Sequence, residues 1–222
     1  TAALPNVTYT EGFDMTARVD REKIEQAVAA ARQAEVAVIV AGLPPVMEGE
    51  GFDRWVMKLP PCQNELIEAV SAVQHRTVVV LQNGGAVEMP WADRVPAILE
   101  CYLGGEAVSE ALWQVLTGKT APSGHLAETF PLRLEDNPSY LFWPGEGDRS
   151  EYREGVFVGY RYYATRNQAV RYPFGHGLTY TTFSFENLKL SADTFAKGQT
   201  LTATVTVTNT GKRPGKALVQ LY

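Results

Sequence analysis

The sequence predicts an α/β fold: a layered α/β sandwich with a mostly parallel sheet, followed by the beginning of an antiparallel β-sandwich. Two observations carry this prediction. As far as Gly118, fully apolar runs of strand length alternate with segments whose apolar residues recur at helical spacing, as in parallel sheets covered by helices. After Phe183, apolar and hydroxyl residues alternate strictly, as in the paired strands of a sandwich.

The helix–strand alternation begins near the amino terminus. Asp20 has the side chain of a helix N-cap, and the apolar spacing after it predicts a helix that extends to Ala34. Val36–Ala41 follows at once as an apolar run of strand length. The unit then repeats, and right-handed crossovers should connect its strands. The further predicted elements are a helix over 63–74, strands over 77–82 and 96–102, and a helix over 106–117 that Gly118 ends.

The amino-acid composition changes after this alternation of helices and strands. From 122 to 182, Pro, Gly and aromatic residues are dense, which predicts irregular or extended chain that is too aromatic for a disordered linker. Thr200–Thr208 then alternates, and a turn at 209–211 leads to an expected strand at Ala217–Leu221. We therefore expect an α/β domain over 1–182, with 122–182 as its connecting region, and a truncated β-sandwich domain over 183–222.

The composition and net charge limit the classes of molecule that this chain is expected to bind. The net charge of −5 disfavours nucleic acid and anionic membranes, which bind basic surfaces. No apolar run approaches the roughly 18–20 residues that span a bilayer. The two cysteines and three histidines lie far apart in the sequence, so we expect no metal site and no cofactor. Unpaired thiols favour a bacterial cytoplasm over secretion, and an oligomer is compatible with these properties.

Candidate chemistry lies directly after the first predicted strand. Ligands of α/β sheets bind on the loops at the carboxyl ends of strands. This loop holds the carboxylates Glu48, Glu50 and Asp53, the base Arg54, and two glycines, with aromatic surface nearby at Phe52. A carboxyl group among other carboxylates holds its proton more tightly and can act as a general acid. The same composition also occurs in ordinary solvated turns, so the loop by itself is compatible with either a catalytic loop or a simple turn.

This loop is the first of a series of short motifs that follow one another in order along the chain. The series begins with Glu48-Gly49-Glu50-Gly51-Phe52-Asp53-Arg54 and continues with Asn83-Gly84-Gly85-Ala86, Gly104-Gly105-Glu106, Glu128-Thr129-Phe130-Pro131 and Pro173-Phe174-Gly175-His176-Gly177. The series resembles glycoside hydrolase family 3, and in particular its β-glucosidases, over nearly the whole chain. The last part, from Asn209-Thr210-Gly211 on, resembles the immunoglobulin-like, fibronectin type III-like domain of that family.

The resemblance implies a retaining mechanism that uses two carboxyl groups. Glu50 maps onto the acid/base of the family, with Glu48 as the alternative. Phe52 and Arg54 are expected to contact the substrate, and an ion pair between Asp53 and Arg54 is expected to hold the loop. The family's nucleophile is an Asp on a (β/α)₈ barrel domain, for which this sequence has no room. The chain alone is therefore expected to be inactive.

Three classes of function follow. The first is part of a β-glucosidase, whose partners would be a β-glucoside or oligosaccharide substrate and the missing barrel; a β-xylosidase-type relative carries the same motifs. The second is a non-catalytic carbohydrate-binding or scaffold module. The third is a nucleotide-binding α/β domain, which the absence of a phosphate-cradling glycine loop disfavours.

Overall fold

The computed structural model describes residues 6–14 and 16–222. The chain divides into two compact units. One unit comprises the chain up to Glu106 together with Glu128–Phe174, and the other comprises Ala107–Ala127 together with Gly175–Tyr222. The loop with the candidate acid residues belongs to the first unit.

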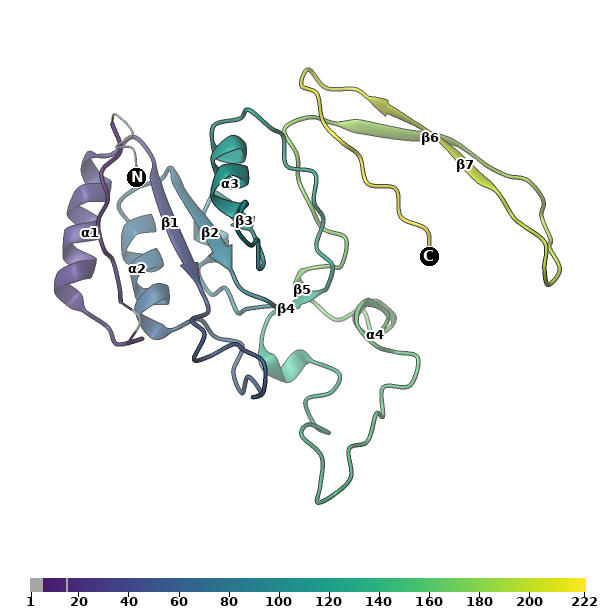
Figure 1. Ribbon diagram of the computed structural model, residues 1–222, viewed down its shortest axis with the longest axis horizontal. Helices are drawn as coiled ribbons and strands as arrows, with labels where there is room; N and C mark the ends of the chain where they lie inside the picture. Colours follow the sequence, from purple (N-terminus) through teal and green to yellow (C-terminus); the bar gives the residue numbers. More distant parts are fainter. Residues whose placement is uncertain (1–5, 15) are drawn as a thin grey trace. The chain divides into compact units, whose positions relative to one another are not determined.

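The first unit is built on a three-stranded parallel sheet. Its strands are β1 (Ala37–Gly42), β2 (Thr77–Gln82) and β3 (Ala97–Glu100), in the order β1-β2-β3. Helices α1 (Arg21–Gln33) and α2 (Pro61–Ser71) pack against each other, and α2 also contacts β1 and β2 (Figure 1). The predicted parallel α/β arrangement is confirmed.

Local signals explain where the helices begin and end. The Asp20 carboxylate accepts hydrogen bonds from the backbone N–H groups of Glu22 (3.1 Å) and Lys23 (3.2 Å), which caps α1 as expected. Helix α2 begins at Pro61, two residues before the predicted start, because proline suits the first helical position. After α2, the Gln74 side chain donates to the carbonyl of Ala34 (2.7 Å) and so ties the end of α1 to it.

Burial in the sheet is one-sided at β1. Ile39 and Ala41 point to one face and are buried, while Val38 and Val40 alternate to the opposite face and are 46% and 48% exposed. Val36, just before the strand, continues this exposed row. The central strand β2 is more deeply enclosed and supplies fully buried residues to the core. The row of valines is therefore an apolar surface on an edge strand.

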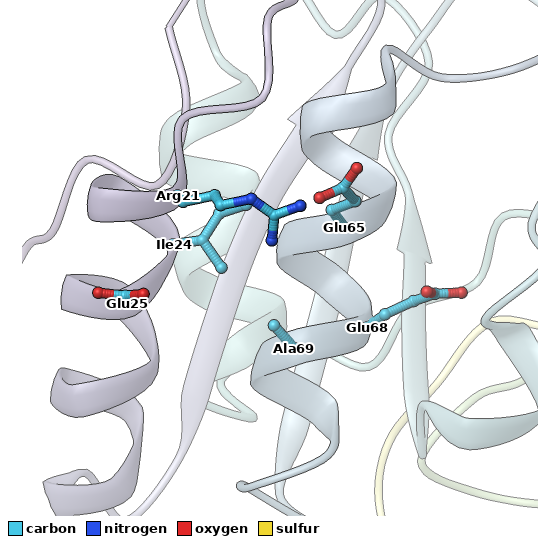
Figure 2. Close-up of a pocket in the computed structure, with 6 residues that line it drawn as sticks. All are labelled: Arg21, Ile24, Glu25, Glu65, Glu68 and Ala69. Carbon is cyan, nitrogen blue, oxygen red and sulfur yellow. The ribbon is translucent and has the colours of Figure 1, made fainter.

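A shallow groove runs between α1 and α2 (Figure 2). Ile24 and Ala69 lie in it, and the Arg21 side chain reaches from α1 toward Glu65 of α2. Glu68 instead points away from α1 and binds Arg94 at 2.7 Å. The groove is thus a seam between two surface helices, and its polar groups do not converge on one point.

The aromatic segment also contains short regular elements. Strand β4 (Phe130–Pro131) pairs antiparallel with β5 (Val170–Tyr172), and helix α4 (Tyr160–Thr165) precedes β5. Two 3-10 helices, η1 (Ala92–Arg94) and η2 (Leu134–Asp136), complete the first unit. None of these elements was predicted, because segments of two to six residues are too short to carry a clear periodic signal.

The second unit contains α3 (Val108–Leu116) and an antiparallel pair, β6 (Phe183–Leu190) and β7 (Ala203–Asn209). The pair confirms the predicted start of an antiparallel sheet. Gly118, at φ +70°, follows the end of α3 as expected. The predicted strand at Ala217–Leu221 is wrong: this segment forms no strand, and β7 pairs only with β6 in the part of the chain that the structure describes.

None of the helices in the described ranges combines the length and apolar character that a membrane crossing requires.

Candidate functional site

The candidate acid loop leaves the carboxyl end of β1, at the tip of that strand in Figure 1. The last residue of the strand is held by a side chain of α2: Gln63 accepts a hydrogen bond from the Gly42 N–H (2.9 Å) and donates to the Gly42 carbonyl (2.8 Å). Gly42 also lies so close to β2 that a Cβ would stand 2.0 Å from the Gln82 carbonyl oxygen. The start of the loop is therefore fixed to the sheet.

The far end of the loop is fixed as well. Lys58 and Glu88 form a parallel bridge, in which the Glu88 N–H donates to the Met57 carbonyl at 2.9 Å. Met57 and Leu59, on either side of Lys58, are buried. The residues between these two attachments can therefore form a defined loop above the carboxyl edge of the sheet.

Within the loop, Glu48 is bound on both carboxylate oxygens. Its Oε2 accepts a hydrogen bond from the backbone N–H of Gly84 at 2.6 Å, and its Oε1 lies 3.4 Å from Nη1 of Arg54. The other terminal nitrogen of Arg54 donates to the Ala86 carbonyl at 2.6 Å. These contacts join the loop after β1 to the loop after β2.

The expected ion pair between Asp53 and Arg54 is wrong, because Arg54 pairs with Glu48 instead. Asp53 is exposed and forms no ion pair among residues 6–14 and 16–222. Glu48 faces both the Gly84 N–H and the guanidinium, whereas an exposed Asp53 would gain little by pairing in water.

Glu50 differs from Glu48 in its surroundings. It is exposed, and its carboxylate has no hydrogen-bond or ion-pair partner within the described part of the chain. The Phe52 ring, 48% exposed, covers the backbone of Gly49, where a Cβ would lie 3.0 Å from a ring carbon. Gly51 has φ +88°, a conformation that favours glycine. The loop thus presents two exposed carboxylates that are unpaired within the described residues, Glu50 and Asp53, together with one exposed aromatic ring.

Two further carboxyl groups lie at the same edge of the sheet, and neither was predicted from the sequence to be a site residue. Glu100, the last residue of β3, accepts hydrogen bonds from the Tyr102 N–H (2.8 Å) and the Asn83 side chain (3.2 Å). Burial raises its pKa to about 7, and the carboxylates of Glu128 and Glu48 add to the effect. Ligands of parallel sheets bind at the carboxyl ends of the strands. This rule predicts a site at the end of the third strand as well as the first, and it would have identified Glu100.

Glu128 is the second of these groups. Burial raises its pKa, while hydrogen bonding from the Ala86 backbone and the charge of Arg54 oppose the increase. A Cβ at Gly85 would lie 3.9 Å from both Arg54 Nη2 and Glu128 Oε1, so both side chains border this glycine. Three carboxyl groups and one guanidinium therefore surround the segment 83–86. Even so, no group of His, Cys, Asp and Glu in the described ranges is arranged to hold a metal ion.

Comparison with known proteins identifies the family. Residues 2–180 match the glycosyl hydrolase family 3 C-terminal domain. The chain belongs to this family. The resemblance read from the motifs is thereby confirmed.

Named relatives of this family 3 chain are hydrolases. It is 51% identical over 98% of its length to thermostable β-glucosidase B of Acetivibrio thermocellus, covering 29% of that protein. It is 45% identical over 96% of its length to an exo-α-(1→6)-L-arabinopyranosidase of Bifidobacterium longum, covering 28%. Among solved structures, a family 3 β-glucosidase of Bifidobacterium adolescentis superposes with a TM-score of 0.83 at 45% identity, over 91% of this chain and 32% of that one.

The chain spans less than a third of the length of each of these relatives.

Proposed function

We propose that this chain is part of a retaining β-glucosidase that hydrolyses terminal β-D-glucosides, and that it supplies the general acid/base loop of the enzyme. The family and the β-glucosidase names among its relatives support this proposal. The nucleophilic Asp would lie on a barrel domain in the rest of the polypeptide, so the 222-residue chain would not hydrolyse glycosides by itself.

Glu50 is the proposed acid/base. The observation that carries this choice is that Glu50 is exposed and unengaged, whereas Glu48 uses both oxygens to hold Gly84 and Arg54. In the first step, the Glu50 carboxyl group would donate its proton to the departing aglycone oxygen. In the second step, the carboxylate would take a proton from the water that attacks the glycosyl-enzyme. A group that must reach substrate and then water has to be accessible.

Phe52 and Arg54 are proposed to contribute to substrate binding in different ways. The exposed ring of Phe52 offers an apolar face for the sugar or the aglycone. Arg54 has both terminal nitrogens engaged by Glu48 and Ala86, so its contribution to binding would come chiefly through the shape of the loop.

The sugar specificity can differ among proteins this similar. A relative at 45% identity is named as an arabinopyranosidase, which favours a second candidate: a family 3 glycosidase that acts on a different pyranoside, such as a xyloside. Hydrolysis of a panel of nitrophenyl glycosides by the complete enzyme separates the two candidates. A non-catalytic module of the same fold would hydrolyse none of them.

The decisive test of Glu50 is its replacement in the complete enzyme. Glu50→Ala should abolish hydrolysis of glucosides with poor leaving groups and largely spare glycosyl-enzyme formation from activated aryl glucosides, which leave without a proton. Azide should partly restore turnover by entering the vacated space. Asp53→Asn, an exposed acid of the same loop, is the matched control and should retain activity. If Glu48→Ala is rescued by azide and Glu50→Ala is not, the assignment is wrong.

A further inference from the structure

The two contacts that tie the acid loop to the neighbouring loop lie on either side of Glu50. Glu48 binds the Gly84 N–H at 2.6 Å, and Arg54 binds the Ala86 carbonyl at 2.6 Å. Glu48 and Arg54 also face each other at 3.4 Å. We call these two side chains, with the backbone groups of Gly84 and Ala86, the loop anchor.

We propose that Glu48 is a positioning residue, which acts through the loop anchor to fix the place of the Glu50 carboxyl group in the active site. This inference rests on the proposed role of Glu50 and assigns a separate role to Glu48. Glu48 would then hold the backbone of the loop in place, and Glu50 would transfer protons.

The geometry of the anchor supports a structural restraint on the loop. A 2.6 Å hydrogen bond from a backbone N–H to a carboxylate is charge-assisted and stronger than a bond between neutral groups. The side chains of Glu48 and Arg54 are only 23% and 20% exposed, so water screens the pair less than it would at the surface. Gly84 allows the close approach, because a Cβ there would lie 3.1 Å from the carboxyl carbon of Glu48.

The spacing along the chain turns this restraint into a restraint on Glu50. Because only Gly49 separates them, the Cα atoms of Glu48 and Glu50 lie at most about 7 Å apart. Arg54, four residues after Glu50, fixes the other side. Gly49 and Gly51 flank Glu50 and would give an untethered loop wide conformational freedom. The anchor therefore removes freedom that the sequence next to Glu50 would otherwise allow.

The two neighbouring carboxyl groups, Glu100 and Glu128, differ from Glu48 in their partners. Burial raises the pKa of both Glu100 and Glu128, so these groups hold their protons more tightly than exposed glutamates. Glu48 instead has a guanidinium on one oxygen and a backbone N–H on the other. Of these three carboxyl groups, Glu48 is the one that forms an ion pair with Arg54.

The effect on catalysis should be selective. A displacement of about 1 Å at a proton donor can lower the rate about a hundredfold. In the complete enzyme, Glu48→Gln and Glu48→Ala should lower kcat for poor leaving groups by about tenfold to a hundredfold, and the alanine variant more, since the glutamine oxygen can still accept from Gly84. KM and the rate of glycosyl-enzyme formation from activated aryl glucosides should change little. Azide should not restore turnover, because Glu50 still occupies its place.

The anchor can also be tested without activity, in the 222-residue chain. The Gly84 amide proton, bonded to a carboxylate at 2.6 Å, should give a downfield nuclear magnetic resonance signal with slow solvent exchange. Glu48→Gln and Glu48→Ala should move this signal upfield and speed its exchange. Glu50→Gln and Asp53→Asn should leave it unchanged. An unchanged fold in the variants is verified by the remaining amide signals.

The outcomes separate this inference from the proposed function. A Gly84 signal that does not respond to Glu48→Ala overturns the anchor, whatever Glu50 does. A shifted signal with an unaltered dependence on the leaving group overturns the positioning role. Azide rescue of Glu48→Ala but not of Glu50→Ala would overturn both assignments. The inference is supported when the signal shifts, poor leaving groups are selectively affected and only Glu50→Ala responds to azide.

Discussion

Replacing Glu100 by glutamine should change how the stability of the chain depends on pH. Burial raises the pKa of this carboxyl group from the 4.5 of an exposed glutamate to about 7. Between these values the folded chain retains a proton that the unfolded chain has lost, so the free energy of unfolding falls as pH rises through the window. At about 1.4 kcal/mol per pH unit the gap corresponds to about 3 kcal/mol. Because water screens the partly exposed carboxyl group, we expect about 2 kcal/mol.

The Glu100→Gln variant has no such titration. It keeps an oxygen for the Tyr102 N–H but places an N–H against the Asn83 side-chain donor, which costs about 1 kcal/mol at every pH. We therefore expect the natural chain to be the more stable by about 1 kcal/mol at pH 4.5, and the variant to be the more stable by about 1 kcal/mol at pH 8.

Urea unfolding of both proteins, followed by tryptophan fluorescence between pH 4.5 and 8, measures this crossover. Glu25→Gln, at an exposed position on α1, controls for the loss of one negative charge and should parallel the natural chain. Parallel profiles for the natural chain and Glu100→Gln would refute the reasoning, because they would mean that Glu100 titrates alike in the folded and unfolded states.

Two further predictions concern the start of the acid loop. Gln63→Ala leaves the N–H and the carbonyl of Gly42 without their partner and should lower the free energy of unfolding by about 2–3 kcal/mol in urea unfolding, whereas Gln26→Ala on the surface of α1 should cost little. Equal losses in the two variants would argue against a stabilising role of the Gln63–Gly42 hydrogen bonds. Gly42→Ala forces a Cβ to within 2.0 Å of the Gln82 carbonyl oxygen and should cost about 3 kcal/mol or more, measured in the same way. Gly124→Ala, where no heavy atom lies within 4 Å of the added carbon, is its control, and a stable Gly42→Ala protein would show that β1 and β2 separate easily.

The sequence was sufficient to predict the elements that have a full periodic pattern. The strand at Thr77–Gln82 has the predicted limits, because a run of β-branched residues between polar ends marks a buried strand. The strands β4 and β5, of two and three residues, carry no comparable signal. The alternation at Ala217–Leu221 does predict strand conformation, but a ladder also requires a partner, which the alternation does not supply.

The place of the candidate site was predictable, whereas its internal contacts were not. The rule that ligands bind at the carboxyl ends of parallel strands located the loop after β1. The partner of Arg54 was mispredicted because adjacency in sequence suggested Asp53, while the folded chain offers Glu48 opposite a backbone N–H that comes from the loop after β2. Contacts between successive strand ends depend on the register of the sheet, which a single sequence does not give.

The exposed valines of β1 affect how soluble this chain is expected to be. Val36, Val38 and Val40 lie on one face of the edge strand β1, which pairs with β2 alone among the strands that the structure describes. An edge of this kind readily recruits another strand or a second molecule. Cover of this row, by another segment or by a second molecule, would therefore make the chain more soluble.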